Sequence, residues 1–306
     1  MMDSKTPIIT ADQAGLARAA QILARGGLVA VPTETVYGLA ARADSDQAVQ
    51  RIYAAKGRPD HNPLIVHVAD LAKARAYALV QPEAEALARQ FWPGPLTLVL
   101  PRKSDARLAR AVTAGLPTLA LRAPAHPAMR ALLALCEFPL AAPSANRSGF
   151  ISPTCAAHVA ASLDGRIDLI LDGGPCAAGL ESTIIAVRED GTREILRPGP
   201  LFADEPVSAP GNELEAPGQE LRHYAPGKPL RLGAMTPEAD EFMIGFGEVA
   251  GDCNLSPDGD LTEAAAQLYA CLHLGALAQK PGIAVACVPD TGLGRAINDR
   301  LRRAAS

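Results

Sequence analysis

A turn near residue 56 gathers cations next to one another. The turn KGRP (residues 56–59) follows an amphipathic stretch, and Asn62 lies between it and the apolar run LIVHV (residues 64–68). Lys56 and Arg58, held close together in a Gly/Pro turn, suit the binding of phosphate oxygens. A ligand-free explanation also fits, because the dipole of a helix favours cations at its C-terminal end. The concentration of charge in one turn favours phosphate binding.

Polar side chains also follow the predicted buried strand LVAV. The segment PTETVYGL (residues 32–39) offers the hydroxyl of Thr35 and the carboxylate of Glu34, at a strand end of the kind where α/β folds bind ligands. Taken alone, a capped helix start is the more common explanation of such a segment. His67 lies inside an apolar run, where a hydrogen-bonded core or edge histidine is the commoner case.

Three later segments end or begin predicted strands with polar groups. Arg122 follows the strand TLAL and suits either a carboxylate clamp or a structural salt bridge. The segment PSANRSG (residues 143–149) packs hydroxyls and an amide into one turn, which resembles an anion-binding nest or a plain loop. The segment EST (residues 181–183) and Arg197 are equally consistent with plain turns that bind no ligand.

One aromatic residue stands out in a featureless region. The segment RHYAP (residues 222–226) places Tyr224 inside a stretch rich in Pro, Gly, Glu and Ala. Such an aromatic residue either ties two domains together or closes over a bound nucleotide.

The familiar catalytic and nucleotide-binding motifs are absent from the sequence. It contains no Walker A loop, no complete dinucleotide fingerprint, no nucleophile elbow and no HExxH pattern. The six cysteines are scattered without a C-x-x-C pair, so we expect buried free thiols rather than a zinc site or a disulfide framework.

Elements that alternate along the chain must position these groups. Amphipathic stretches such as Ala14 to Arg25 and SDQAVQRIYAAK alternate with short apolar runs such as LIVHV and LTLVL, which predicts an α/β sheet. Residues 1–200 form a first domain, and the aperiodic segment at 201–228 is interpreted as a linker. Residues 229–306 repeat the alternation and predict a second, small α/β domain.

Length, composition and charge limit the function classes. The chain has 306 residues, of which 48% are hydrophobic, enough for two domains. We find no membrane-spanning run and no secretory signal, so a cytoplasmic location is expected. The net charge is −4, divided as 21 − 18 = +3 for residues 1–200 and 8 − 15 = −7 for residues 201–306. This asymmetry favours anionic ligands at the first part, and ordinary variation of surface charge explains it as well.

Seven segments, in this order, resemble the YrdC/Sua5 family of threonylcarbamoyl-AMP synthases: PTETVYGL, KGRPDHNPL, FWPGPLTLVL, LPTLALRAP, PSANRSG, EST and LRPG. The resemblance covers about residues 8–200, and HYAPGKPL, NLSPDGDL and GLGRAINDRL resemble the two-domain Sua5 branch. It implies a YrdC-like twisted mixed sheet with flanking helices and a concave active-site cleft. A small Rossmann-like C-terminal domain would follow.

The resemblance also implies a reaction. The amine of L-threonine captures bicarbonate or CO2, and the carbamate oxygen attacks the α-phosphate of ATP, with magnesium present. Threonylcarbamoyl-AMP and pyrophosphate result. A downstream transferase complex then modifies the adenosine next to the anticodon of tRNA, and this enzyme's own contact with tRNA would be weak.

Family motifs assign residues to both substrates, with no covalent nucleophile and unknown metal ligands. The residues implied for threonine are Thr35, His67, Arg122, Ala142 and Ser182. Those implied for ATP are Lys56, Arg58, Asn62, Thr118, Ser144, Ser152, Arg197 and Tyr224. Glu34 either orients the loop of Thr35 or helps to hold magnesium.

Two other functions were weighed. An RNA-binding or ribosome-maturation module is disfavoured by six phenylalanines, one tryptophan and a negative net charge, which provide few stacking platforms and a weak electrostatic footprint. A carbamoyl-transfer enzyme of hydrogenase maturation would need a much longer chain with paired-cysteine segments.

Overall fold

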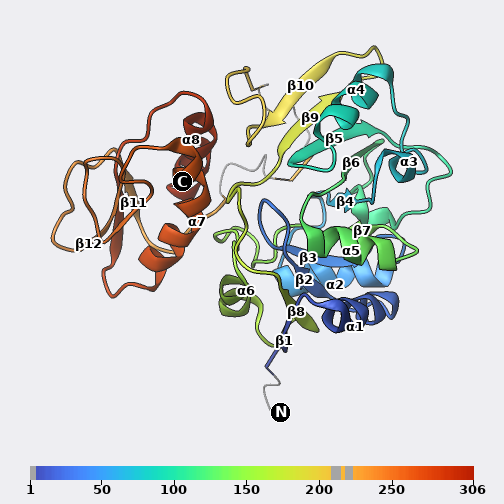
Figure 1. The fold of residues 1–306 in the computed structure, drawn as a ribbon, viewed down its shortest axis with the longest axis horizontal. Coiled ribbons are helices and arrows are strands. Elements are labelled where there is room, and N and C mark those ends of the chain that lie inside the picture. The colour runs from blue at the N-terminus through green and yellow to red at the C-terminus, as the bar shows by residue number, and fades with distance from the viewer. Residues whose placement is uncertain (1–4, 208–214, 218–222) are drawn as a thin grey trace.

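The computed structural model describes residues 5–207, 215–217 and 223–306. Two sheets organise these residues into a large lobe, residues 5–207, and a small lobe, residues 223–306 (Figure 1). None of the described helices is long and apolar enough to cross a membrane.

A ten-stranded mixed sheet forms the centre of the large lobe. The pairs β1–β8, β2–β8, β4–β6 and β5–β9 are parallel, and the remaining neighbours are antiparallel. The mixed sheet with flanking helices confirms the predicted fold class of this lobe. In spatial order the strands are β1 (Ile8–Thr10), β8 (Leu169–Asp172), β2 (Val29–Val31), β3 (Gly38–Arg42), β7 (Leu140–Ala141), β4 (Ile65–His67), β6 (Thr118–Arg122), β5 (Leu96–Pro101), β9 (Thr183–Val187) and β10 (Arg193–Arg197).

Helices cover both faces of this sheet because successive strand residues point to opposite sides. Val29 and Val31 pack with α1 and α5, whereas Leu28 and Ala30 belong to the core under α2, α4 and α6. Side chains cap several of these helices, as Asp12 does at α1 by accepting a hydrogen bond from the amide of Gly15 at 2.8 Å. The helices are α1 (Gln13–Ala24), α2 (Asp46–Lys56), α3 (Leu71–Ala74), α4 (Pro82–Phe91), the 3₁₀ turn η1 (Arg110–Val112), α5 (Pro127–Leu135) and α6 (Ala156–Leu163).

The small lobe is a four-stranded parallel sheet with two helices. Its order is β11–β14–β12–β13, and its apolar core continues into the large lobe at Val36, Ile151 and Leu180. A parallel sheet that packs with α7 and α8 confirms the predicted small α/β unit. The elements are β11 (Leu230–Leu232), β12 (Glu241–Gly245), β13 (Cys253–Asn254), α7 (Leu261–Leu277), β14 (Gly282–Val285) and α8 (Leu293–Ala304).

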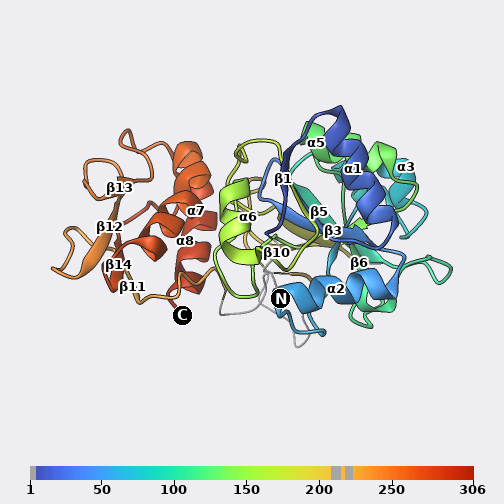
Figure 2. The ribbon, with the colours of Figure 1, turned by 90° about the horizontal axis from the view of Figure 1, so that it is seen from below.

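The two lobes meet where α7 and α8 face α6 and the loops around β9 and β10 (Figure 2). His158 of α6 stacks on His273 of α7 with ring centroids 3.8 Å apart, and His273 also contacts the carbonyl oxygen of Ser152 at 3.2 Å. Polar groups as well as apolar ones therefore join the lobes.

Two expectations from the sequence were wrong. Residues 33–37 do not start a helix; they form a loop between β2 and β3, because the chain turns straight back into an antiparallel strand. Only Cys176 and Cys271 are buried, whereas Cys287 is exposed and the other three thiols are partly exposed. The predicted linker, residues 201–228, lies partly outside the described residues.

Candidate functional site

A pocket that opens to solvent lies over the face of the large sheet, and its atom-free space, with the solvent at its mouth included, is about 550 Å³. Its lining comes from the β2–β3 loop, strand β4 and the ends of β6 and β10. The turn after α2, the segment after β7, the residues just before β9 and the segment between the lobes complete it. Eight of the thirteen residues implied for substrate binding line it: Thr35, Arg58, His67, Arg122, Ala142, Ser144, Ser182 and Arg197.

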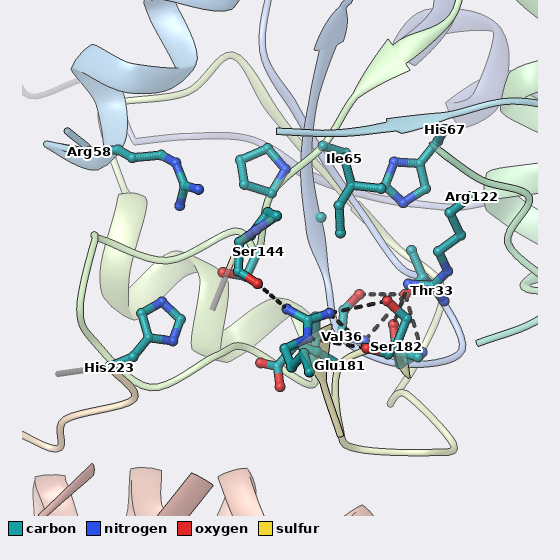
Figure 3. A pocket seen from close by; sticks show the side chains of 16 residues that line it. Thr33, Val36, Arg58, Ile65, His67, Arg122, Ser144, Glu181, Ser182 and His223 are labelled. Carbon is teal, nitrogen blue, oxygen red and sulfur yellow. Dashed lines mark hydrogen bonds between the residues drawn. The ribbon is translucent and has the colours of Figure 1, made fainter. Parts of the chain in front are cut away.

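Strand geometry explains why His67 and Arg122 meet. Ile65 and His67 are two residues apart on β4 and therefore point to the same face. The register of the parallel pair β4–β6 puts His67 beside Arg122. Figure 3 shows His67 and Arg122 on one side of the pocket, and Arg58 and His223 on the other. Two chemically different sides thus face one cavity.

Arg122 is held by neighbours within the large lobe. Its Nη2 donates to Glu34 Oε1 at 2.6 Å, its Nη1 to Thr35 Oγ1 at 3.0 Å and its Nε to the carbonyl oxygen of Gly94 at 3.2 Å. These bonds leave one N–H on each terminal nitrogen, enough for two bonds to a carboxylate. Arg122 therefore forms a salt bridge with Glu34 and still presents N–H groups to the pocket.

Glu34 fixes the direction of that guanidinium. Its second oxygen, Oε2, accepts a hydrogen bond from the amide of Ala125 at 3.0 Å. Although burial acts to raise the pKa of Glu34, the charge and hydrogen bond of Arg122 lower it below the usual value. The carboxylate stays ionised and engaged, which fits an orienting role.

His67 is a neutral imidazole, and one of its ring nitrogens has no hydrogen-bond partner in the part of the chain that the structure describes. Burial, followed by the charge of Arg122, lowers the pKa of His67 to about 3. Its Nδ1 is buried and has no hydrogen-bond partner among the described residues. The expectation of a hydrogen-bonded core histidine was therefore wrong for this nitrogen. An unpaired buried polar atom in a pocket is what a ligand's hydrogen bond would satisfy.

The opposite side is cationic. Arg58 donates from Nη2 to Asn62 Oδ1 and, at 2.9 Å, to the carbonyl oxygen of Pro63. Asn62 is buried behind Arg58 and does not line the pocket. It acts on the pocket by orienting this guanidinium.

Lys56 is also set back from the cavity. Its Nζ donates to the carbonyl oxygens of Ser144 (2.6 Å) and Asn146. Burial, then the charge of Arg58, lowers the pKa of Lys56 well below its usual value. Lys56 thus fixes the turn that presents Ser144 to the pocket.

Ser182 and Arg197 form one unit on the third side. Arg197 donates from Nη2 to the carbonyl oxygen of Ser182 at 2.9 Å and to its Oγ at 3.1 Å. Thr97, which sequence reasoning missed, lies 2.7 Å from the Ser182 hydroxyl. Arg197 Nη1 reaches the carbonyl oxygen of Pro217 at 3.2 Å, so the segment between the lobes also borders the pocket.

Three of the implied residues lie away from the cavity. Thr118 begins β6, four residues before Arg122. Ser152 is buried and donates to Glu181 Oε1 at 2.6 Å. Tyr224 packs in the small-lobe core, 5.6 Å between ring centroids from Tyr269. This packing matches the domain-tying explanation.

Sequence reasoning also missed lining residues. His223 and Pro217 line the pocket from the segment between the lobes, and Thr33 and Glu181 from loops. The signal for His223 was its position next to Tyr224 in the RHYAP segment. No comparable signal marked Pro217, which contributes through its backbone.

The arrangement favours binding and charge neutralisation over covalent catalysis. No nucleophile and base form a hydrogen-bonded pair among the described lining residues, and no group of three His, Cys, Asp or Glu side chains there could hold a metal ion. Three arginines, two neutral imidazoles and several hydroxyls line the pocket and can orient two anionic reactants.

Comparisons with known proteins agree across both lobes. Residues 21–199 match the Sua5/YciO/YrdC family model, described as "Telomere recombination", and residues 192–306 match the model "Threonylcarbamoyl-AMP synthase, C-terminal domain". The chain is 41% identical to threonylcarbamoyl-AMP synthase of Bacillus subtilis, covering 95% of this chain and 92% of the relative. It is also 41% identical to that of Pyrococcus abyssi, covering 94% and 93%. The crystal structure of P. abyssi Sua5 complexed with L-threonine superposes with a TM-score of 0.88 at 37% identity, covering 98% and 96%.

Proposed function

This chain belongs to the Sua5/YciO/YrdC family, and we propose that it is an L-threonylcarbamoyladenylate synthase. It forms threonylcarbamoyl-AMP and pyrophosphate from L-threonine, bicarbonate or CO2, and ATP. The observation that carries the proposal is one pocket with two different sides. Arg122 and a neutral His67, whose Nδ1 has no hydrogen-bond partner in the described part of the chain, form one side, and Arg58 lies on the other. A small zwitterion and a polyphosphate need these two environments.

Threonine occupies the side of Arg122 in this proposal. The two remaining N–H groups of Arg122 bind its carboxylate, and the Nδ1 of His67 forms a hydrogen bond with a polar group of the substrate. Thr35, Ser182 and the backbone of Ala142 complete the site. Because His67 is neutral, it adds no charge that would repel the ammonium precursor of the reacting amine.

ATP occupies the opposite side. Arg58, Ser144 and Arg197 line it directly, whereas Lys56 and Asn62 act by orienting Ser144 and Arg58. The carbamate oxygen of N-carboxythreonine attacks the α-phosphorus, and the bond from this phosphorus to the β-phosphate bridging oxygen breaks. Pyrophosphate leaves with the electron pair, and arginines neutralise its developing charge.

Magnesium finds no protein site of its own among the described residues. The carboxylates of Glu34 and Glu181 are both engaged by donors from the protein. Magnesium commonly binds through substrate phosphates and water, so it would enter with ATP, whose charge it would partly neutralise.

The wider setting is proposed on the same basis. Residues 1–200 form the catalytic domain, 201–228 the linker and 229–306 the C-terminal domain. The enzyme works in the cytoplasm and passes its product to a tRNA threonylcarbamoyl transferase complex, with a weak contact to tRNA itself. That transfer installs N6-threonylcarbamoyladenosine.

Pyrophosphate release tests the proposal. Purified protein receives ATP and magnesium, with threonine and bicarbonate omitted in turn and serine replacing threonine in a parallel reaction. Release that requires both co-substrates supports the synthase, because the carbamate is the nucleophile. Release without threonine, or none in any mixture, would contradict it.

A further inference from the structure

One guanidinium of the small lobe reaches into the large lobe beside the pocket. Arg300 of α8 is fully buried. Its Nε donates to Glu181 Oε2 and its Nη2 to the carbonyl oxygen of Pro198, both at 2.9 Å. Glu181 directly precedes Ser182, and Pro198 directly follows Arg197. Arg300 therefore holds two segments that each carry a pocket residue.

Those two segments behave as one unit. The register of β9 and β10 is irregular between Ile195 and Arg197, which turns the end of β10 locally. Gly199 lies so close that a Cβ there would be 2.4 Å from the amide nitrogen of Thr183. A displacement of either segment would therefore move Ser182 and Arg197 together.

Glu181 is a tie rather than a reactant. Its carboxylate accepts hydrogen bonds from Ser152 at 2.6 Å, from Tyr269 at 2.8 and 3.0 Å, and from Arg300. Burial acts to raise the pKa of Glu181, but Arg300 and Arg197 lower it to about 2. Because three donors hold its two oxygens, the ionised carboxylate is engaged as a tie between segments. Two of the three donors, Tyr269 and Arg300, belong to α7 and α8.

We infer that Arg300 and Tyr269 are positioning residues for the pocket. Through Pro198 and Glu181 they fix Arg197, which lines the nucleotide side, together with Ser182 of the threonine site, so the small lobe completes the pocket. The competing explanation is that the ion pair only fastens the lobes together. It predicts lower stability without altered substrate binding. The inference rests on the proposed function.

A double-mutant cycle separates the two explanations. Arg300→Met should raise the KM for ATP about tenfold in the wild-type background but less than about twofold in the Arg197→Met background, because linked residues are not additive. The matched control is Arg302→Met, an exposed arginine on the same helix, which should change neither value. A folded Arg300→Met protein with wild-type KM for ATP, or an additive cycle, would overturn the inference.

A milder variant covers the case in which Arg300→Met does not fold, since it leaves a buried carboxylate unpaired. Tyr269→Phe removes only the hydroxyl group that donates a hydrogen bond to Glu181, and it keeps the packing of the ring. It should raise the KM for ATP about threefold with little change in kcat. An unchanged KM in this folded variant would equally contradict the inference.

Amide hydrogen exchange distinguishes failure of the positioning role from failure of the proposed function, because exchange is measured without turnover. In Tyr269→Phe, and in Arg300→Met if folded, peptides covering residues 180–184 and 197–201 should exchange faster than in the wild type, whereas α1 should not change. Faster exchange in these variants, combined with a wild type that shows no threonine-dependent pyrophosphate release, would reject only the synthase. Unchanged exchange in an active enzyme would reject only the positioning role.

Discussion

The two sides of the pocket are supported in different ways. Arg122 is oriented by Glu34, Thr35 and Gly94, all within the large lobe. Arg197 is tied to Ser182, to Pro217 between the lobes and, through the neighbouring segments, to Arg300 of the small lobe. The first side is thus built by one sheet, and the second depends on contact between the lobes. Substrate affinity on the first side should therefore respond to substitutions in the large lobe. Affinity on the second side should respond to substitutions in the small lobe as well.

The largest effect is expected on the side built by one sheet. Arg122→Met should raise the KM for threonine about a hundredfold and the KM for ATP less than threefold, because one buried carboxylate partner is lost while the cations opposite remain. Steady-state pyrophosphate release with each substrate varied measures both. Arg102→Met, at an exposed arginine beside the same strands, is the control. Equal losses for both substrates would refute the division of the pocket.

Glu34→Gln tests the same side of the pocket and should have a smaller effect than Arg122→Met. The amide still accepts the bond from Ala125, but the charge that orients Arg122 is gone. The KM for threonine should rise about fivefold, with ATP unaffected. Exposed Glu137→Gln serves as the control. A lost magnesium dependence of ATP binding in Glu34→Gln would instead assign Glu34 to the metal.

The contact between the lobes should weaken in acid. Burial, followed by the charge of His158, lowers the pKa of His273 to about 4, against about 6.5 when unfolded. The unfolded state therefore binds the proton more tightly, and stability present above pH 6.5 is lost as the pH falls toward 4.

His273→Phe isolates this contribution. It should reduce the loss of unfolding free energy between pH 7 and pH 5 by about 1 kcal/mol, measured by urea denaturation at both pH values. His61→Gln, at an exposed histidine, should retain the wild-type slope. If the unfolding free energy of His273→Phe changed with pH as that of the wild type does, the histidine pair would not be the cause of the loss of stability in acid.

The smallest effect is expected at Tyr224. Its hydroxyl is buried without a hydrogen-bond partner among the described residues, so Tyr224→Phe should leave the melting temperature unchanged or slightly raised. The KM for ATP then decides whether this hydroxyl contacts the nucleotide. A severalfold increase would place it at the site, and no change would leave Tyr224 with the role of joining the lobes.

Sequence patterns predicted most helices and buried strands, because periodicity reports local burial directly. The helix at Ala14 to Arg25, for example, is α1 with its cap at Asp12. Strand β3 was missed because the segment that contains it follows a run of threonines that mimics a helix cap. Short elements such as β13 carry too few residues for a period.

The candidate site could be predicted only in part from the sequence. Arg58 stands out because it shares a Gly/Pro turn with Lys56, and Arg122 because it follows an apolar strand. Their supports, such as Thr97 behind Ser182 and Arg300 behind Glu181, come from distant segments joined only by the fold. Ion pairs over 119 positions leave no local pattern.

The most direct test of the central claim is detection of the product itself. The protein is incubated with ATP, magnesium, L-threonine and ¹³C-bicarbonate, and the nucleotides are analysed at once by mass spectrometry. The account predicts an AMP conjugate of threonine that contains one ¹³C atom and forms in step with pyrophosphate. ATP consumption without a labelled conjugate, or a threonine adenylate that lacks the label, would contradict it.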